Sequence, residues 1–408
     1  MGRYQVLGER NFRVFLTGYF ISYTAYWVTL LAIGWWIWEV THSAAWTGFI
    51  FFCDLFPALL VTPYASAMAD KGDRFAILKA VLWIQVVLGF SLAGIAAVGL
   101  LTPMILAIFV FVDGMLVGVS QPAFFGMINR IVSKENLSAA VGLNSSAVQT
   151  TYILGPLLAG LLFTFGIGII PIALGINAAG VLIYLYALSH LNLHPAPERG
   201  EGPEEGVWQG TIEGISIFWK NPMVFSATVL LLSTAVIQRP LLSMLPGVND
   251  NYDLLPQAFF TWLAACLMAG NVAAGLYHAA RNEDAGVTKR LALGAVAVIA
   301  LLVVTFLGLG WFNLGVAFAM IMLFLLGFGC SYVTTGNVIV LQNRTPEAQR
   351  SRVLGNNFMM SRAMGAIALI VAGFAIERFG FTYGMLVPAV FSAGLLLLAL
   401  ARWQARTS

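Results

Sequence analysis

Charge is what this sequence has least of. Only 10% of its 408 residues are Asp, Glu, Lys or Arg, while 60% are hydrophobic. A soluble globular chain carries about 25% charged residues, and a water-soluble fold of this length could not bury so much apolar surface. Long apolar runs of this kind are typical of membrane-spanning helices. The composition therefore predicts an all-α membrane protein.

Cysteine, basic clusters and nucleotide motifs are also scarce. Three cysteines lie far apart in apolar runs, which predicts neither a disulfide framework nor a metal site. The net charge of +3 is not gathered into the basic surface that nucleic-acid binding needs. A P-loop is absent, so ATP is not the expected energy source. We expect no enzyme activity, cofactor or metal. The histidines lack partner Ser, Cys or metal-ligand residues and are read as incidental: His42, His190, His194 and His278.

What the sequence does contain is a series of apolar stretches, each about 20 residues long. The first follows three arginines and is too long for a cleavable signal peptide, so we expect it to be retained as a span. Charges and Gly, Pro or Asn turns separate the rest. The predicted spans are 14–38, 45–69, 76–100, 104–129, 138–163, 169–190, 222–245, 256–280, 290–310, 314–340, 353–375 and 382–401.

A polar segment divides these twelve spans into six and six. Residues 191–220 contain three prolines and a cluster of acids, which predicts a cytoplasmic linker between an N-terminal bundle (1–190) and a C-terminal bundle (221–408). With the N-terminus inside, 18 of the 21 Lys and Arg residues fall on the inner side. By the positive-inside rule, both termini are predicted to be cytoplasmic, in a bacterial inner membrane.

The two halves repeat each other in sequence. Segments 127–146 and 341–360 both place a basic residue, a polar turn with Glu and a Gly–Asn pair before the next helix, at an offset of about 212 residues. Parallel repeats of this kind form transporters whose solute site lies between the halves.

The short charged loop at 66–74, SAMADKGDR, carries a first family signature. It resembles the Gly-x-x-Ala-Asp-Arg-x-Gly-Arg loop of the major facilitator superfamily, matching at Ala69, Asp70 and Arg74 and departing at Ser66 and Asp73. The resemblance implies a conformational latch formed by Asp70, Arg74 and Arg130. A plain charged turn that fixes topology is the alternative.

Other segments resemble one branch of that superfamily, the exporters of drugs and siderophores to which enterobactin exporters belong. They are 11–22, 34–48, 121–162 and 344–355. The resemblance implies a monomer that exports amphipathic molecules by alternating access with proton antiport. It also implies that Gly155, Pro156 and Gly160 form an exporter-type motif that kinks a helix, although Gly and Pro are common in membrane helices.

The fourth predicted span differs from that of many proton antiporters, which leaves the coupling of transport to protons open. The fourth span reads DGMLVG at 113–118 and lacks the Arg that many proton antiporters carry there. An uncoupled facilitative carrier or lipid-like flippase therefore remains an alternative, as does a non-transporting receptor on the same fold.

Four ionisable residues fall inside predicted spans, where charge is costly and often functional. Asp113 and Asp54, both on helices of the N-terminal half, are candidates for carrying the coupling proton. Arg362 is a candidate for binding an anionic group of the solute, because its forked guanidinium matches carboxylate and catecholate oxygens. Arg239 is expected to snorkel or gate. The alternative is that an Asp pairs with either Arg as a tie between helices.

In the family fold, spans one, four, seven and ten face the central cavity. Tyr19, Tyr23 and Tyr26 follow an i, i+4, i+7 spacing and share a helix face, which suits a flat amphipathic ligand or simply packing. Three tryptophans near the end of span one are predicted to lie in an interfacial belt: Trp35, Trp36 and Trp38. The remaining binding candidates on these spans are Gln121, Gln238, Tyr332 and Asn337.

Overall fold

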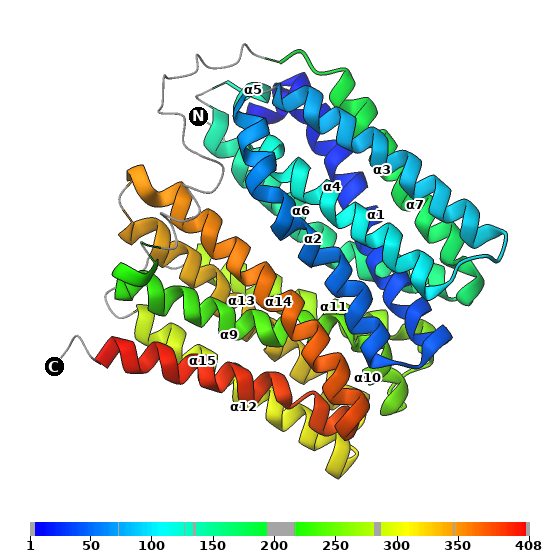
Figure 1. Cartoon of the computed structure of the whole chain (residues 1–408), viewed down its shortest axis with the longest axis vertical. Helices are drawn as coiled ribbons and strands as arrows, with labels where there is room; N and C mark the ends of the chain where they lie inside the picture. The colour runs from blue at the N-terminus through cyan, green and yellow to red at the C-terminus, as the bar shows by residue number, and fades with distance from the viewer. Residues whose placement is uncertain are drawn as a thin grey trace. The chain divides into compact units, whose positions relative to one another are not determined.

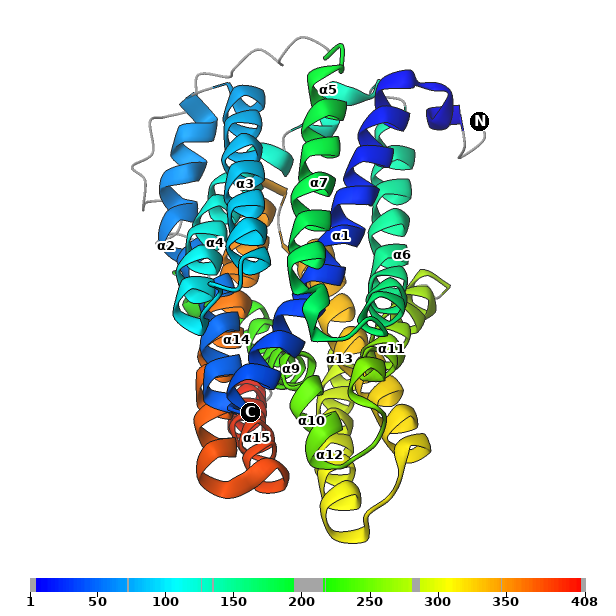
Figure 2. The same cartoon turned by 90° about the vertical axis from the view of Figure 1, so that its right-hand side faces the viewer.

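The computed structural model describes residues 5–71, 73–125, 127–133, 136–193, 216, 218–280, 287–345 and 347–404. Across these residues the regular structure is helical and no strand occurs. The helices are shown in Figures 1 and 2. Most of the predicted linker, from 194 to 215, lies outside the described residues.

The helices of the first half of the chain follow one another through short turns. They are η1 (Gln5–Gly8), α1 (Arg10–Thr41), α2 (Ala44–Lys71), α3 (Arg74–Ala97), α4 (Pro103–Phe125), α5 (Ile128–Ile131), α6 (Leu137–Phe163), η3 (Ile167–Ile169) and α7 (Ile170–Ser189). Those of the second half are α9 (Pro222–Ser243), α10 (Leu245–Asn251), η4 (Gln257–Phe259), α11 (Thr261–Ala279), α12 (Val287–Phe312), α13 (Val316–Arg344), α14 (Glu347–Gly384) and α15 (Val387–Gln404).

Ten helices in the described part of the chain are long and apolar enough to cross a membrane. Two further helices, α11 with 19 residues and α15 with 18, coincide with the eighth and twelfth predicted spans. Each predicted span thus corresponds to one helix, and the prediction of an all-α, multi-pass membrane protein is confirmed. The backbone of α14 is interrupted at Gly380, whose φ of 77° suits glycine, so its regular part ends there.

The chain forms two compact units. One contains residues 1–36 and 57–207, and the other contains 37–56 and 208–408. The end of α1 and the first part of α2 therefore group with the C-terminal helices, although their sequence position assigns them to the N-terminal half. The boundaries expected from sequence, 1–190, 191–220 and 221–408, remain a prediction.

Close helix contacts in the first unit depend on small residues. A Cβ added to Gly155 of α6 would overlap Trp27 of α1, and one added to Gly118 of α4 would lie 2.8 Å from the Ala58 Cα of α2. Glycine at such crossings lets two membrane helices approach closely. The apolar core at one end of this unit, around Phe12, joins residues of α1, α3, α4, α6 and α7.

The second unit is built around α9, whose side chains are buried along most of its length. Its small polar residues do not disturb this packing, because they bond to backbone or to neighbouring helices. Ser233 donates to the Leu230 carbonyl, and Thr228 accepts from the Asn357 amide of α14 at 3.0 Å. Asn337 of α13 donates to the Ala227 carbonyl.

Candidate functional site

An aromatic ladder runs along α1. The rings of Tyr19 and Tyr23 stack with centroids 5.5 Å apart, and those of Tyr23 and Tyr26 at 5.7 Å. Trp27 meets Tyr152 of α6 edge-on at 5.1 Å. The three tyrosines expected to share a face therefore do so, and α6 extends that face with an aromatic ring that the sequence did not single out.

Two buried polar atoms lie in this aromatic region without a hydrogen-bond partner among the described residues. They are the indole nitrogen of Trp27 and the phenol oxygen of Tyr184 on α7. Buried donors of this kind carry a desolvation cost unless a ligand or water satisfies them. The ladder thus combines flat apolar surface with unused hydrogen-bonding capacity.

Asp113 of α4 is partly buried and is held by an uncharged neighbour. The Gln85 amide of α3 donates to its carboxylate at 2.9 Å. This hydrogen bond fixes the position of the Asp113 carboxylate relative to α3. The arrangement is compatible with the role predicted for Asp113, which stays a prediction.

Asp54 is placed differently from Asp113. Sequence position puts both on the same half of the chain, yet Asp54 lies in the second unit. There its carboxylate interacts electrostatically with the guanidinium groups of Arg362 on α14 and Arg239 on α9. Three of the four ionisable residues predicted inside spans are therefore gathered in one unit.

Other predicted binding residues mostly contact their own unit. Gln238 of α9 donates to Asn271 of α11 at 3.1 Å, next to Arg239 in sequence. Asn337 is fully buried and its amide donates to a backbone carbonyl of α9, which indicates a role in helix packing. Gln121 lies partly buried in α4.

Tyr332 of α13 stacks on His278 of α11 with ring centroids 4.9 Å apart. The ring nitrogen Nε2 of the same histidine lies 2.9 Å from the Tyr332 carbonyl oxygen. From the sequence, this histidine is predicted to have no functional role. The adjacent Tyr277, which also contacts Tyr332, was the one signal of an aromatic cluster at the end of α11.

The signature loop is described only in part. The side chain of Asp70 lies outside the described residues. The next acidic residue, Asp73, caps α3 by accepting from the Phe75 N–H at 2.9 Å, and it lies 3.9 Å from the Arg130 guanidinium. Arg74 is the first residue of α3. In the described part of the loop, the Arg130 guanidinium thus lies near the carboxylate of Asp73, while the latch role stays a prediction.

The exporter-type motif lies within α6, where Pro156 removes one backbone hydrogen bond. Gly155 faces Trp27 so closely that a side chain would not fit, and Gly160 is buried one turn later. This motif therefore fixes how α6 packs against the aromatic ladder of α1.

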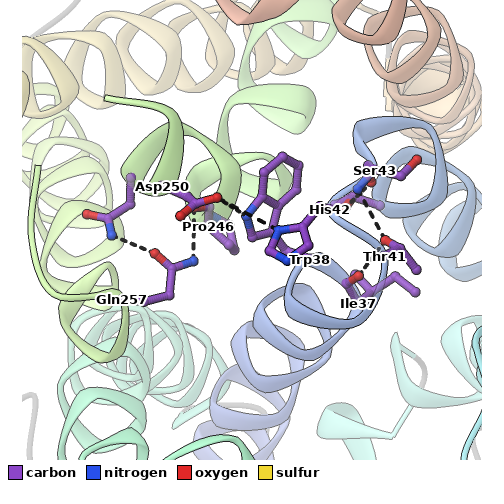
Figure 3. A network of polar contacts seen from close by, with 10 residues as sticks. Ile37, Trp38, Thr41, His42, Ser43, Pro246, Asp250 and Gln257 are labelled. Atoms are coloured by element: carbon purple, nitrogen blue, oxygen red, sulfur yellow. Dashed lines mark hydrogen bonds and ion pairs between the residues drawn. The ribbon is translucent and has the colours of Figure 1, made fainter. Parts of the chain in front are cut away.

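Trp38 at the end of α1 is a packing residue, so its prediction as part of an interfacial belt is wrong. Its indole N–H donates to the Asp250 carboxylate of α10 at 3.0 Å, and its ring meets Phe381 edge-on at 5.5 Å. Figure 3 shows the hydrogen bond between Trp38 and Asp250. Trp35 and Trp36 are buried as well, each less than 10% exposed. A belt residue would instead present its ring to lipid headgroups.

Two acidic residues of the C-terminal helices hold the hairpin segment, residues 37–45, which joins α1 to α2. Asp250 lies 3.9 Å from the imidazole of His42 in addition to its bond with Trp38 (Figure 3). Glu377 of α14 accepts from the Ser43 hydroxyl at 2.6 Å and from the Ala45 N–H at 3.3 Å. Neither carboxylate was a candidate from sequence, because both lie near predicted span ends where charge is ordinary.

Comparison with known proteins agrees with this architecture. Residues 15–322 match the Major Facilitator Superfamily. The chain is 22% identical over 379 residues to a staphyloferrin A transporter of Staphylococcus aureus (strain NCTC 8325 / PS 47), covering 90% of each chain.

Solved structures show the same fold at low sequence identity. A bacterial homologue of the human lysosomal transporter Spinster, in an inward-facing and unoccupied conformation, gives a TM-score of 0.75 at 14% identity, with 97% of this chain and 98% of that chain covered. A bacterial homologue of the iron transporter ferroportin gives 0.67 at 15% identity, with 96% and 98% covered.

The helical fold of the described residues and the extent of the sequence match define a class, the polytopic membrane transporters. The chain belongs to the major facilitator superfamily. It is therefore a membrane protein whose family transports small molecules.

Proposed function

We propose that this protein exports a small amphipathic molecule, of drug or siderophore type, across the bacterial inner membrane by alternating access. The observation that carries the proposal is the aromatic ladder on α1, in which Tyr19, Tyr23 and Tyr26 stack in series and Trp27 has an unused buried donor. Flat apolar walls with a few polar groups are typical of small-molecule sites. The similarity to a siderophore transporter supports the same substrate class.

Proton antiport through Asp113 is the second part of the proposal. Its carboxylate accepts a hydrogen bond from Gln85 within a membrane-spanning helix, where ionisable residues are often functional. The proton and the solute are the proposed partners of a monomeric carrier with both termini in the cytoplasm. No role in chemistry on the solute is proposed.

The remaining predicted residues keep secondary roles. Loop residues Asp70, Arg74 and Arg130 act as a latch between conformations, and the α6 motif sets the packing of the ladder. Tyr332 and Gln238 are proposed to shape the solute site in the second unit. Asn337 is the weakest of the candidates, since its amide already serves the α9 backbone.

Uptake driven by a pH gradient in inverted proteoliposomes tests the antiport. Purified wild type and Asp113→Asn are compared with a panel of ethidium and catecholate siderophores, and Asp253→Asn serves as the matched control. Asp253 is an exposed loop residue with φ 46°, a conformation that Asn also adopts. We expect accumulation that needs an acidic interior, is lost in Asp113→Asn and is kept in Asp253→Asn.

Two other outcomes lead to the alternative functions. Equal flux with and without a gradient in all three proteins would make the chain an uncoupled facilitative carrier or flippase. Ligand binding without flux of any compound would make it a receptor. Either result contradicts the proposed antiport.

A further inference from the structure

Three side chains form a short hydrogen-bonded chain between α9 and α11. The Gln238 amide nitrogen of α9 donates to the Asn271 Oδ1 of α11 at 3.1 Å. The Asn271 amide nitrogen in turn donates to the Met268 sulfur at 3.4 Å. Met268 and Asn271 are almost fully buried, whereas Gln238 is only partly buried. The chain therefore begins at a buried sulfur and ends at a side chain that is partly accessible.

This chain fixes which end of the Gln238 carboxamide points away from it. A thioether sulfur can only accept a hydrogen bond, so it selects the amide nitrogen of Asn271. The Asn271 oxygen then faces Gln238 and selects the nitrogen of that carboxamide. Turning either amide over would oppose two acceptors. The Gln238 Oε1 is left as an acceptor, and it receives no hydrogen bond from the described residues.

The partial exposure of Gln238 sets it apart from the preceding residues of α9. Every residue from Val224 to Ile237 is buried, whereas Gln238 is partly exposed and Arg239 is exposed. All of them lie within the membrane-spanning stretch Val224–Ser243. Polar side chains in such helices usually face the protein interior or water-filled space. The Gln238 oxygen is therefore expected to face space that a solute can enter.

We propose that the Gln238 Oε1 accepts a hydrogen bond from a hydroxyl or N–H group of the solute, and that Asn271 is the residue that positions it. This inference rests on the proposed transport function and deepens it, since it names a donor that the solute carries. A solute without that donor would leave the carboxamide oxygen unpaired, which costs free energy. A hydrogen bond that only held α9 and α11 together would not distinguish solutes in this way.

The test compares two ligands that differ in their hydrogen-bond donors. 2,3-Dihydroxybenzamide and 2,3-dimethoxybenzamide are titrated calorimetrically into the purified full-length protein. Both compounds keep the ring, the amide group and the two ring oxygens, and only the first carries hydroxyl donors. We expect the wild type to bind the dihydroxy compound about tenfold more tightly than the dimethoxy compound.

Two variants separate contact with the solute from positioning. Gln238→Met keeps the side-chain length and removes the carboxamide, so the preference should fall to about twofold or less. Asn271→Leu leaves the Gln238 carboxamide free to turn over, so the preference should fall to about threefold. Gln342→Met makes the same exchange at an exposed position of α13 and should keep the wild-type preference. Methoxy groups are bulkier in every protein, so the change in the ratio between variants isolates the hydrogen bond.

Equal binding of the two ligands by the wild type, or no binding of the dihydroxy compound, would overturn the proposal. An unchanged ratio in Gln238→Met and Asn271→Leu would overturn it too, because the chain would then only pack α9 on α11. A ratio lost in Gln238→Met alone would support the acceptor and refute the positioning role of Asn271. Should Gln238→Met fail to fold, Asn271→Leu decides the test.

A separate measurement distinguishes failure of this site from failure of the proposed function. Flux of ethidium in proteoliposomes, together with equal binding of the two benzamides, would refute the Gln238 site and leave transport intact. Absence of flux for every compound would instead refute the proposed function.

Discussion

Trp38 and Asp250 form the clearest polar contact at the scale of single residues. The indole N–H donates to a carboxylate at 3.0 Å, and the ring is almost fully buried against Phe381 and Gly247. Hydrogen bonds to charged groups contribute more than neutral ones, although partial exposure of Asp250 reduces the effect. This contact stabilises the packing of the hairpin segment against α10.

Replacing Trp38 by Phe keeps an aromatic ring and removes the donor. We expect the free energy of unfolding to fall by about 1 kcal/mol and the thermal midpoint of the detergent-purified protein to fall by about 2 °C. Trp46→Phe is the matched control, because the indole N–H of Trp46 makes no hydrogen bond within the described residues. A midpoint that falls equally in both variants would show that ring size, and not the bond to Asp250, stabilises the hairpin.

Some of these residues could be predicted from the sequence and others could not, for a physical reason. Asp54, Arg239 and Arg362 stood out because charge is rare in apolar spans. Asp250 and Glu377 did not, since span ends carry charge routinely. Trp38 was misread because a tryptophan near a span end looks the same whether its ring faces lipid or a buried carboxylate. That choice depends on which helix packs beside it, and one sequence does not show this.

At the scale of elements, backbone contact between helices is set by glycine. On α11, a Cβ at Gly270 would overlap the Phe324 carbonyl oxygen of α13, and Gly327 of α13 meets the Leu267 carbonyl in the same way. In lipid, the hydrophobic effect does not drive helices together, so their association depends on close packing, which small residues allow. The pair of glycines therefore defines the α11–α13 interface.

Gly270→Ala should destabilise the protein even though Ala favours helix formation. We expect a loss of about 1–3 kcal/mol, typical of overpacking, measured as a lower thermal midpoint in detergent. Gly394→Ala on α15 is the control, because a Cβ there meets nothing within 4 Å and should be neutral or slightly stabilising. The interface assignment fails if Gly270→Ala is as stable as Gly394→Ala.

The helices themselves were predictable because a span is a local property: about 20 apolar residues must satisfy their backbone bonds internally. The packing partners were not. The grouping of residues 37–56 with the C-terminal helices arises from contacts such as Ser43 with Glu377, separated by 334 residues. No local pattern encodes a contact of that range.

At the scale of the whole molecule, family membership and fold lead to the central claim that the chain is an alternating-access carrier. Such a carrier exposes one solute site to each side of the membrane in turn. After one solute molecule leaves, a second molecule can bind the site on that side and be carried back, so the two molecules exchange. A channel has no such exchange step, and a receptor moves no solute. This property separates the three mechanisms without knowledge of the coupling ion.

Counterflow is the measurement that tests this claim most directly. Proteoliposomes are preloaded with an unlabelled catecholate siderophore and diluted into a trace of the labelled compound, without any pH gradient. The account predicts a transient accumulation of label above its equilibrium level, present with wild type and with Asp113→Asn, because exchange needs no net proton movement. Label that only equilibrates, or never enters liposomes while still binding the protein, would contradict it.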